Sequence, residues 1–332
     1  MRLGALLLVV LVAVAAAGCG GGGDENGGDG GGIRVAVVTD IGGLNDRGFN
    51  ALANDGLQRA KAELEIDGRV FISEQASDYV PNLSTPARQG YDLVIANGFL
   101  MGDALATVAG QFPDTSFAII DFPWEALKGK PMNARGLVFA EQEGGYLAGV
   151  AAASVSDTGV VSSIGGQAVP AVVAFLAGYR AGVNATSPDA RVLSAYSEDF
   201  VDQAKCTEIA LSQVQRRSDV VFAAAGGCGL GALQVAKERG VWGIGVDNDQ
   251  SFLGPHILTS ATKKVDEAVF RTIGDVVDGT FEGGSDTLFD VANGGIGYGE
   301  VSADVPNREE LVATLEDVSR QIADGDVTPP RS

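Results

Sequence analysis

Aspartate residues follow three of the apolar segments that we predict to be β-strands. Asp40, Asp121 and Asp247 each come directly after such a segment. In open parallel sheets, ligands bind outside the carboxyl ends of the strands. A single aspartate at such a place can simply cap a helix, but three at equivalent places indicate a binding site that is rich in hydrogen-bond acceptors.

A glycine-rich turn follows the first of these aspartates. Residues 41–50 read IGGLNDRGFN, and the glycines allow the backbone to approach a ligand closely. Asn45 and Asp46 offer hydrogen-bonding groups within this turn. Phe49, in the first turn of the next predicted helix, either anchors the core or presents its ring to a planar ligand.

These residues need a frame of strands and helices to bring them together. From Ile33 onward, short β-branched segments alternate with amphipathic helical segments, a pattern typical of α/β proteins with parallel sheets. About 300 residues exceed what a single core usually organises, so we expect two lobes. The predicted strands are 34–39, 70–73, 93–97, 116–120, 136–138, 158–164, 191–196, 220–224 and 242–246. The predicted helices are 48–65, 100–112, 143–156, 172–184, 202–216, 230–239, 265–278 and 307–323.

The amino-terminal residues predict export and anchoring. Arg2 precedes an apolar run over residues 3–17 that is too short for a comfortable membrane span and ends in Gly18-Cys19. We interpret residues 1–18 as a lipoprotein signal peptide and Cys19 as the lipidated residue; ordinary secretory cleavage, which leaves a free cysteine, is the alternative. Residues 19–32 then form the lipidated cysteine and a glycine-rich tether.

Composition narrows the classes of partner. The formal net charge of −20 argues against a nucleic-acid partner and against electrostatic adhesion to anionic lipid. We therefore expect a small-molecule ligand, a monomeric chain and no cofactor. The sequence places the protein outside the cytoplasm, held to the bacterial cell membrane by its lipid.

Two further cysteines remain in the exported part of the chain. Cys206 lies near the start of one predicted helix and Cys228 opens the next. Both helix starts lie beside the carboxyl edge of a parallel sheet, so the two sulfur atoms can meet in a disulfide. Two unpaired buried thiols are the alternative.

Six segments spread over the chain resemble the basic membrane protein family of substrate-binding lipoproteins, which includes purine nucleoside receptors of spirochaetes. The segments are 40–57 (DIGGLNDRGFNALANDGL), 141–149 (EQEGGYLAG), 175–182 (FLAGYRAG), 226–227 (GG), 245–250 (GVDNDQ) and 260–266 (SATKKVD). The resemblance implies a type I periplasmic-binding-protein fold, with two doubly wound parallel-sheet lobes joined by a three-crossing hinge. It places 33–140 and 244–275 in one lobe, 141–243 and 276–306 in the other, and a helix and tail at 307–332.

The resemblance also implies roles for individual residues. Asp40 and Asp121 bind the ligand from the first lobe, and Phe49 stacks on its base. Asp247, assisted by Lys263, binds the ribose hydroxyls. Further lining positions are Phe175 as the second stacking face, Asn45, Gly226 and Gly227. The implied function is the capture of a nucleoside, most clearly a purine nucleoside, for the membrane permease of an ABC importer.

Three other functions stay open on the residues alone. A sugar also satisfies the carboxylates, and a sensor uses the same closing lobes. A metal-dependent nucleoside hydrolase needs several closely spaced carboxylates for a hard cation, but Ile41, Leu44 and Asn45 stand where acidic groups would help. The single histidine, His256, lies in a predicted loop and is interpreted as structural.

Overall fold

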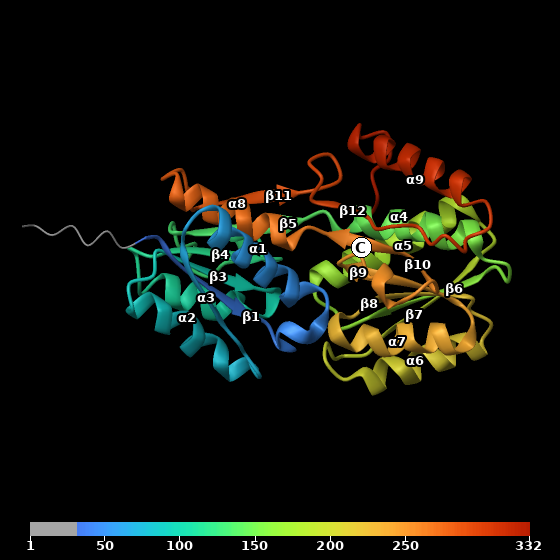
Figure 1. The fold of residues 1–332 in the computed structure, drawn as a ribbon, viewed down its shortest axis with the longest axis horizontal. Coiled ribbons are helices and arrows are strands. Elements are labelled where there is room, and N and C mark those ends of the chain that lie inside the picture. Colours follow the sequence, from blue (N-terminus) through green and yellow to red (C-terminus); the bar gives the residue numbers. More distant parts are fainter. Residues whose placement is uncertain (1–31) are drawn as a thin grey trace, which may run out of the picture. The chain divides into compact units, whose positions relative to one another are not determined.

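The computed structural model describes residues 32–332, and this part of the chain contains two six-stranded sheets flanked by helices (Figure 1). The strand orders are β11-β5-β4-β3-β1-β2 and β12-β10-β9-β8-β6-β7. All strand pairs are parallel except β10 and β12, which are antiparallel. This is the doubly wound α/β architecture that the alternating pattern predicts.

The first lobe contains the first sheet and the helices packed on it. Its strands are β1 Arg34–Thr39, β2 Asp67–Phe71, β3 Leu93–Asn97, β4 Ser116–Ile120, β5 Ala134–Phe139 and β11 Ser285–Phe289. Its α-helices are α1 Phe49–Glu63, α2 Tyr79–Arg88, α3 Gly102–Ala109 and α8 Val265–Val277. Short 3-10 helices are η1 Gly43–Asp46, η2 Ala76–Asp78, η3 Phe99–Met101 and η4 Trp124–Ala126.

The second lobe is built in the same way on the second sheet. Its strands are β6 Val160–Gly165, β7 Arg191–Tyr196, β8 Val220–Ala224, β9 Trp242–Asp247, β10 Ile257–Lys263 and β12 Ile296–Tyr298. Its helices are α4 Glu141–Val155, α5 Pro170–Thr186, α6 Gln203–Gln215, α7 Gly226–Arg239, α9 Arg308–Ala323 and the 3-10 helix η5 Ser251–Leu253.

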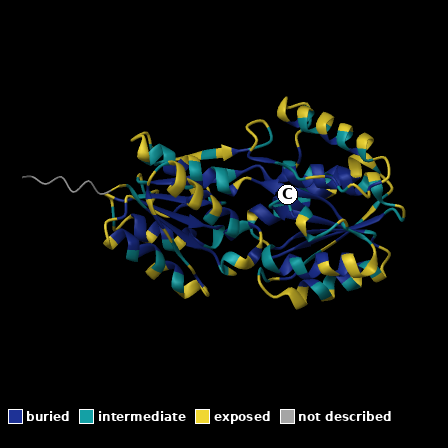
Figure 2. Cartoon of the chain, in the orientation of Figure 1, coloured by how far each residue is buried: buried dark blue, intermediate teal, exposed yellow. Residues whose placement is uncertain are grey.

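Both faces of each sheet are covered, which explains why the inner strands β1, β3, β4, β6 and β8 are buried along almost their whole length. In the first lobe, α1 and α8 pack on one face and α2 and α3 on the other. In the second lobe, α4, α5 and α9 cover one face and α6 and α7 the other. Figure 2 shows the buried residues concentrated in the two sheets and on the inner sides of these helices.

Three crossings connect the lobes within residues 32–332, as the three-crossing hinge requires. The chain passes from β5 to α4, from β10 to α8, and from β11 to β12. The Ala140 N–H donates to the carbonyl of Phe289 at 2.9 Å, and the Lys264 N–H donates to the carbonyl of Gly295 at 2.9 Å. The crossings are therefore hydrogen-bonded to one another.

The expected boundaries of the lobes after residue 243 are wrong. We expected 244–275 in the first lobe and 276–306 in the second. Helix α8 does belong to the first lobe, but β9 and β10 belong to the second sheet and β11 to the first. The reason is strand pairing: β9 lies parallel beside β8, with Trp242 opposite Val220, and β10 extends the same sheet. The chain leaves the second lobe only after Lys263.

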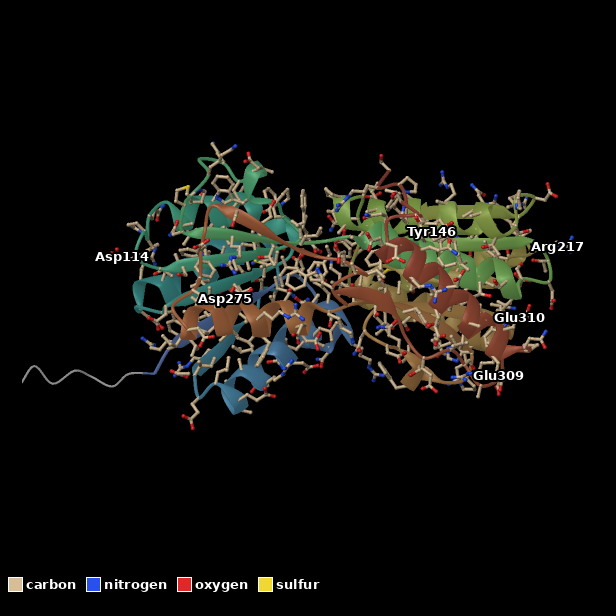
Figure 3. The ribbon with its side chains drawn as sticks, turned by 90° about the horizontal axis from the view of Figure 1, so that it is seen from above. Asp114, Tyr146, Arg217, Asp275, Glu309 and Glu310 are labelled. Atoms are coloured by element: carbon tan, nitrogen blue, oxygen red, sulfur yellow. A yellow bond between two sulfur atoms is a disulfide. The ribbon has the colours of Figure 1, made fainter. Side chains whose placement is uncertain are left out.

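Charged side chains cover the outside of the two lobes. Asp114 is exposed on the first lobe, and Arg217, Glu309 and Glu310 are exposed on the second (Figure 3). None of the helices between residues 32 and 332 is both long and apolar enough to cross a membrane. The predicted signal peptide, the lipidated Cys19 and most of the tether lie outside the described residues.

Candidate functional site

A cavity between the two lobes collects most of the candidate residues. The space between its lining residues is about 700 Å³, and part of it is open to solvent. Both lobes belong to one compact unit over residues 32–332. Of the nine expected ligand-binding residues, eight line this cavity: Asp40, Phe49, Asp121, Phe175, Gly226, Gly227, Asp247 and Lys263.

Asp40, which follows β1, is held rigidly at the edge of the first sheet. Its Oδ1 accepts hydrogen bonds from the hydroxyl of Tyr79 and, at 2.7 Å, from the backbone N–H of Ile41. Burial raises the pKa of Asp40 to about 6, although these two hydrogen bonds favour the ionised form. No protein donor within residues 32–332 bonds its other oxygen, Oδ2, which can accept from a ligand.

Lys263, the last residue of β10, lies at the floor of the cavity among carboxylates. Its ammonium group donates to Asp121 Oδ1 at 2.5 Å and to Glu141 Oε1 at 3.1 Å. The Lys263 side chain is 1% exposed, and those of Asp121 and Glu141 are 8% and 3% exposed. Burial alone lowers the pKa of a lysine, but Asp121, Glu141 and Asp247 outweigh it and raise the pKa of Lys263. The ammonium group is therefore charged, and it links the first lobe to the second.

Asp247 ends β9 without a protein hydrogen bond to its side chain among the described residues. Burial, opposed by Lys263 and reinforced by the neighbouring carboxylates, raises the pKa of Asp247 to about 7. The sequence predicts that Lys263 assists Asp247. The charge of the lysine favours the ionised form of Asp247, while its hydrogen bonds go to Asp121 and Glu141. Both oxygens of Asp247 remain available to a ligand.

Asp121 and Asp247 share an unusual backbone conformation. Their φ angles are 67° and 63°, in the left-handed region. This region costs about 1–3 kcal/mol for most residues other than glycine, and such positions cluster at functional sites. Two carboxylates in this conformation, each at the end of a strand and each lining one cavity, indicate that the sheet edges are shaped for binding rather than for stability alone.

Asp46 and Asn45 are neighbours in sequence but face different ways. Asp46 is buried and accepts hydrogen bonds from the backbone N–H groups of Gly48, Asn50 and Ala51 at 3.2, 2.7 and 3.1 Å, so it caps α1. Asn45 is exposed and lines a separate surface hollow, so its expected place in the ligand cavity is wrong. Both residues lie in the 3-10 helix η1, where successive side chains point about 120° apart.

Aromatic rings enter the cavity from both lobes. Phe49 begins α1 in the first lobe, and Phe175 lies on α5 in the second. Two further rings were not expected: Phe99, which lies 5.0 Å from Phe122 between ring centroids, and Phe200. Phe99 follows β3 and Phe200 lies in the loop after β7, so the rule that singled out the aspartates would also have found them.

The remaining lining residues that sequence reasoning missed are mainly apolar. They surround the carboxylates and exclude water from the cavity walls. They are Ile41, Leu100, Val169, Ala171, Val172, Ala224 and Val246, together with Asn50 and Gly98, and the capping residue Asp46 also lines the cavity.

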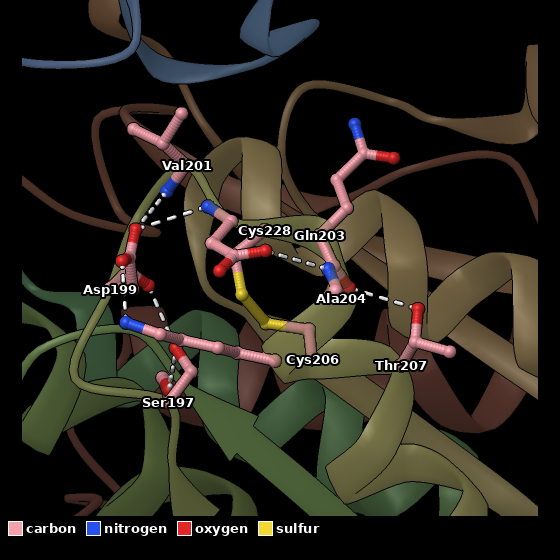
Figure 4. The surroundings of a disulfide bond; sticks show 11 residues. Ser197, Asp199, Val201, Gln203, Ala204, Cys206, Thr207 and Cys228 are labelled. Atoms are coloured by element: carbon pink, nitrogen blue, oxygen red, sulfur yellow. Dashed lines mark hydrogen bonds and ion pairs between the residues drawn. A yellow bond between two sulfur atoms is a disulfide. The ribbon is translucent and has the colours of Figure 1, made fainter.

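A disulfide joins Cys206 and Cys228 behind the second-lobe wall, with the two Cα atoms 5.6 Å apart (Figure 4). The N–H of Cys228 donates to the carbonyl of Phe200 at 3.0 Å. Asp199 orders the same loop by accepting from Lys205 Nζ at 2.8 Å and from the N–H of Val201 at 2.8 Å. The hydrogen bond from Lys205 is the main reason that the pKa of Asp199 falls to about 2. The disulfide thus fixes the part of the wall that carries Phe200.

The chain matches a family model over residues 33–328; the model describes ABC transporter substrate-binding proteins that are PnrA-like. The ABC transporter nucleoside-binding protein BmpA of Lactococcus lactis is 33% identical to it over 320 residues, which cover 90% of this chain and 89% of that protein. The CD4+ T-cell-stimulating antigen of Listeria monocytogenes is 35% identical over 318 residues, covering 89% and 87%. A solved ABC transporter solute-binding protein from Aeropyrum pernix has a TM-score of 0.81 at 26% identity, covering 90% of this chain and 94% of that one.

The chain belongs to the Bmp family. It is therefore a substrate-binding protein of an ABC transporter system, with the type I periplasmic-binding-protein fold that the resemblance implied. Proteins of this kind work outside the cytoplasm, where they take up a small molecule and present it to a membrane permease. In this Bmp-family protein, both lobes contribute residues to the cavity that lies between them.

The cavity of this Bmp-family chain offers a ligand more hydrogen-bond acceptors than donors. Asp40, Asp121 and Asp247 supply carboxylate oxygens, while Lys263 supplies the ammonium group. A ligand that fits has several donors and an apolar, flat part for the rings. Among residues 32–332, no group of three or more His, Cys, Asp or Glu side chains has the arrangement of a metal site.

Proposed function

We propose that this Bmp-family protein captures a nucleoside, and in particular a purine nucleoside, for import by an ABC transporter. The observation that carries the proposal is the combination, in one cavity, of aromatic rings from both lobes with three carboxylates that have unused acceptor oxygens. The base stacks against Phe49 and Phe175, and the ribose hydroxyls donate to Asp247. The relative from Lactococcus lactis, named a nucleoside-binding protein, supports this assignment.

Charge selects a nucleoside over a nucleotide. Asp121, Glu141 and Asp247 surround the ammonium group of Lys263, and Asp40 also lines the cavity, so the cavity is already rich in carboxyl groups. A phosphate dianion would be repelled here more strongly than in water, because the buried site screens charges poorly. A neutral nucleoside meets no such repulsion, and its hydroxyl groups match the carboxylate oxygens.

Stacking selects a nucleoside over a free sugar. A base held against an aromatic ring gains about 1–3 kcal/mol, by analogy with proteins that bind single-stranded nucleic acid. A sugar would satisfy the carboxylates but would leave Phe49 and Phe175 without a flat partner. The rings therefore favour a ligand that contains a base as well as a diol.

The mechanism follows from the hinge. A nucleoside binds one lobe first, and rotation about the three crossings brings the other lobe onto it. The ligand stabilises the closed form because only that form makes both sets of contacts. The closed protein, a monomer anchored through a lipid on Cys19, then docks on the permease and releases the nucleoside unchanged, without catalysis.

Calorimetric titration with inosine, guanosine, adenosine, cytidine and ribose tests this function, together with chromatography of the recovered ligand. We expect saturable one-to-one binding of purine nucleosides and recovery of the intact nucleoside. Binding of ribose alone would replace the nucleoside with a sugar, and conversion of a nucleoside to free base would make the protein a hydrolase.

A further inference from the structure

Glu141 lies where the hinge meets the ligand cavity. It is the first residue of α4, directly after the first crossing, and is 2% exposed. Its Oε1 accepts from Lys263 Nζ at 3.1 Å, and its Oε2 lies 3.5 Å from a guanidinium nitrogen of Arg331. One buried carboxylate therefore connects a lysine that lines the cavity with an arginine that is 58% exposed.

Arg331 also holds the backbone of the first crossing. Its guanidinium group donates to the carbonyl of Phe139, the last residue of β5, at 2.9 Å. The ring of Phe139 stacks on that of Phe289 in the third crossing, with 4.9 Å between centroids, and lies 4.7 Å from Lys263 Nζ. The arginine thus contacts the point at which all three crossings come together.

The segment that carries Arg331 is fixed by contacts of its own. The N–H of Val327 donates to the carbonyl of Gln321 at 3.1 Å, and Pro329 is buried. Pro330 and Ser332 line a shallow hollow together with residues of α5. The position of Arg331 therefore does not depend on Glu141 alone, and the segment 327–332 acts as a strap from α9 to the hinge.

We propose that Glu141 and Arg331 are positioning residues that connect this strap to the ligand site. Arg331 holds the first crossing and one oxygen of Glu141 from the solvent side. Glu141, through its other oxygen, holds the ammonium group of Lys263 at the floor of the cavity. Residues 327–332 thereby contribute to ligand affinity and to hinge stability without touching the ligand; the affinity part rests on the proposed nucleoside binding.

The balance around Lys263 explains why the outer arginine matters. Asp121 holds the ammonium group at 2.5 Å and Glu141 holds it at 3.1 Å, so its position depends on both carboxylates. Without Arg331, Glu141 keeps a single cationic partner and loses the contact that fixes its outer oxygen. A buried carboxylate with fewer partners is costly, so Glu141 shifts and Lys263 moves toward Asp121.

A double-mutant cycle tests the connection. The proteins are the wild type, Arg331→Gln, Glu141→Gln and the double variant, each titrated with adenosine by calorimetry. We expect Arg331→Gln to weaken adenosine binding about 3- to 10-fold, in line with one hydrogen bond to a charged group. In the Glu141→Gln background the same change should have a smaller effect, because the contact between the two side chains is already weakened and mainly the hydrogen bond from Arg331 to the carbonyl of Phe139 remains to be lost.

Arg320→Gln is the matched control, since among the residues that the structure describes the Arg320 side chain pairs only with Asp317, on the surface of α9. It should leave adenosine affinity unchanged. Arg331→Lys retains the charge but not the planar fork of the guanidinium group, so its affinity should lie between those of the wild type and Arg331→Gln. Thermal denaturation of every variant separates these effects from loss of fold.

Hydrogen exchange of the ligand-free proteins gives a reading that does not need a nucleoside. The amides of Ala140 and Lys264, which bond across the crossings, should exchange faster in Arg331→Gln and Glu141→Gln than in the wild type or Arg320→Gln. If adenosine fails to bind the wild type, the proposed nucleoside function is wrong. The exchange rates of the ligand-free variants still show whether the strap stabilises the hinge. The inference is overturned if amide exchange in Arg331→Gln is the same as in the wild type. It is also overturned if Arg331→Gln weakens adenosine binding equally in the wild type and in Glu141→Gln.

Discussion

Replacing Asp247 with asparagine should stabilise the ligand-free protein at neutral pH while destroying its binding site. Asp247 is buried, and its backbone is in the left-handed region. Its carboxyl group has no protein hydrogen bond among the described residues. Burial raises the pKa of Asp247 from 3.8 to about 7. The ionised carboxylate therefore destabilises the folded, ligand-free protein at the place where we expect the ribose to bind, as is common for residues that serve function.

The size and the pH dependence of the effect follow from this pKa. A rise from 3.8 to about 7 corresponds to roughly 4 kcal/mol as an upper estimate, at 1.36 kcal/mol per pKa unit. Below pH 3.8 the group is protonated in both the folded and unfolded states and contributes no difference. Between pH 3.8 and 7 the unfolded state binds fewer protons, so the stability of the wild type falls as the pH rises. Asp247→Asn has no carboxyl group to ionise at this position. The difference in the free energy of unfolding between the variant and the wild type therefore grows between pH 3.8 and 7 and is constant above pH 7.

Urea unfolding of the ligand-free protein, followed by circular dichroism at pH 4 and pH 8, measures this effect. Asp247→Asn should unfold at a higher urea concentration than the wild type at pH 8 and at a similar one at pH 4. Asp114→Asn, an exposed position on the first lobe (Figure 3), serves as the control and should change neither. The reasoning is refuted if Asp247→Asn is no more stable than the wild type at pH 8, or if it binds adenosine with unchanged affinity.

Three further changes have definite expected outcomes. Replacing Cys206 and Cys228 together with alanine opens a loop with a sequence separation of 22 residues and should lower the free energy of unfolding by about 3 kcal/mol; an unchanged thermal midpoint would show that the disulfide is not a major support. Phe49→Leu should weaken adenosine binding about 10-fold through lost stacking but keep the thermal midpoint, and calorimetry with unchanged affinity would remove Phe49 from the site. Asp121→Asn weakens the charged hydrogen bond to Lys263 and should cost about 2–3 kcal/mol of stability in urea; no loss would mean that Glu141 alone holds the lysine.

The parts of the fold that could be predicted are those in which strand composition and burial agree. β1, β3, β4, β7 and β8 have the expected bounds. β1, β3, β4 and β8 are apolar segments inside a sheet that is covered on both faces, whereas β7 is an edge strand in which Leu193 is buried. β10 was missed because Thr259, Ser260 and Thr262 make it look like a polar loop, although all seven of its residues are buried. The lobe boundary that the resemblance implied, at residue 244, falls inside β9, whereas the crossing follows β10.

The site residues that are positioned by the sheet topology could be predicted. Those whose side-chain direction depends on the local turn geometry could not. Strand ends lie at one edge of a parallel sheet, so Asp40, Asp121 and Asp247 could be grouped from the sequence. The one-residue difference between Asn45 and Asp46 depends on the turn geometry of η1, which no composition pattern specifies. Glu141 was not expected either, because its partners on β10 and in residues 327–332 come from distant parts of the chain.

The most direct measurement of the central claim compares adenosine with adenosine 5′-monophosphate by calorimetry at pH 8, where the phosphate is a dianion. The two ligands share the base and the diol and differ in the phosphate, so the comparison isolates the charge of the cavity around Asp40, Asp121 and Asp247. We expect saturable binding of adenosine and a loss of at least 100-fold in affinity, about 3 kcal/mol, for the monophosphate. Equal affinity for the two ligands, or no binding of adenosine, would contradict a nucleoside site in this cavity.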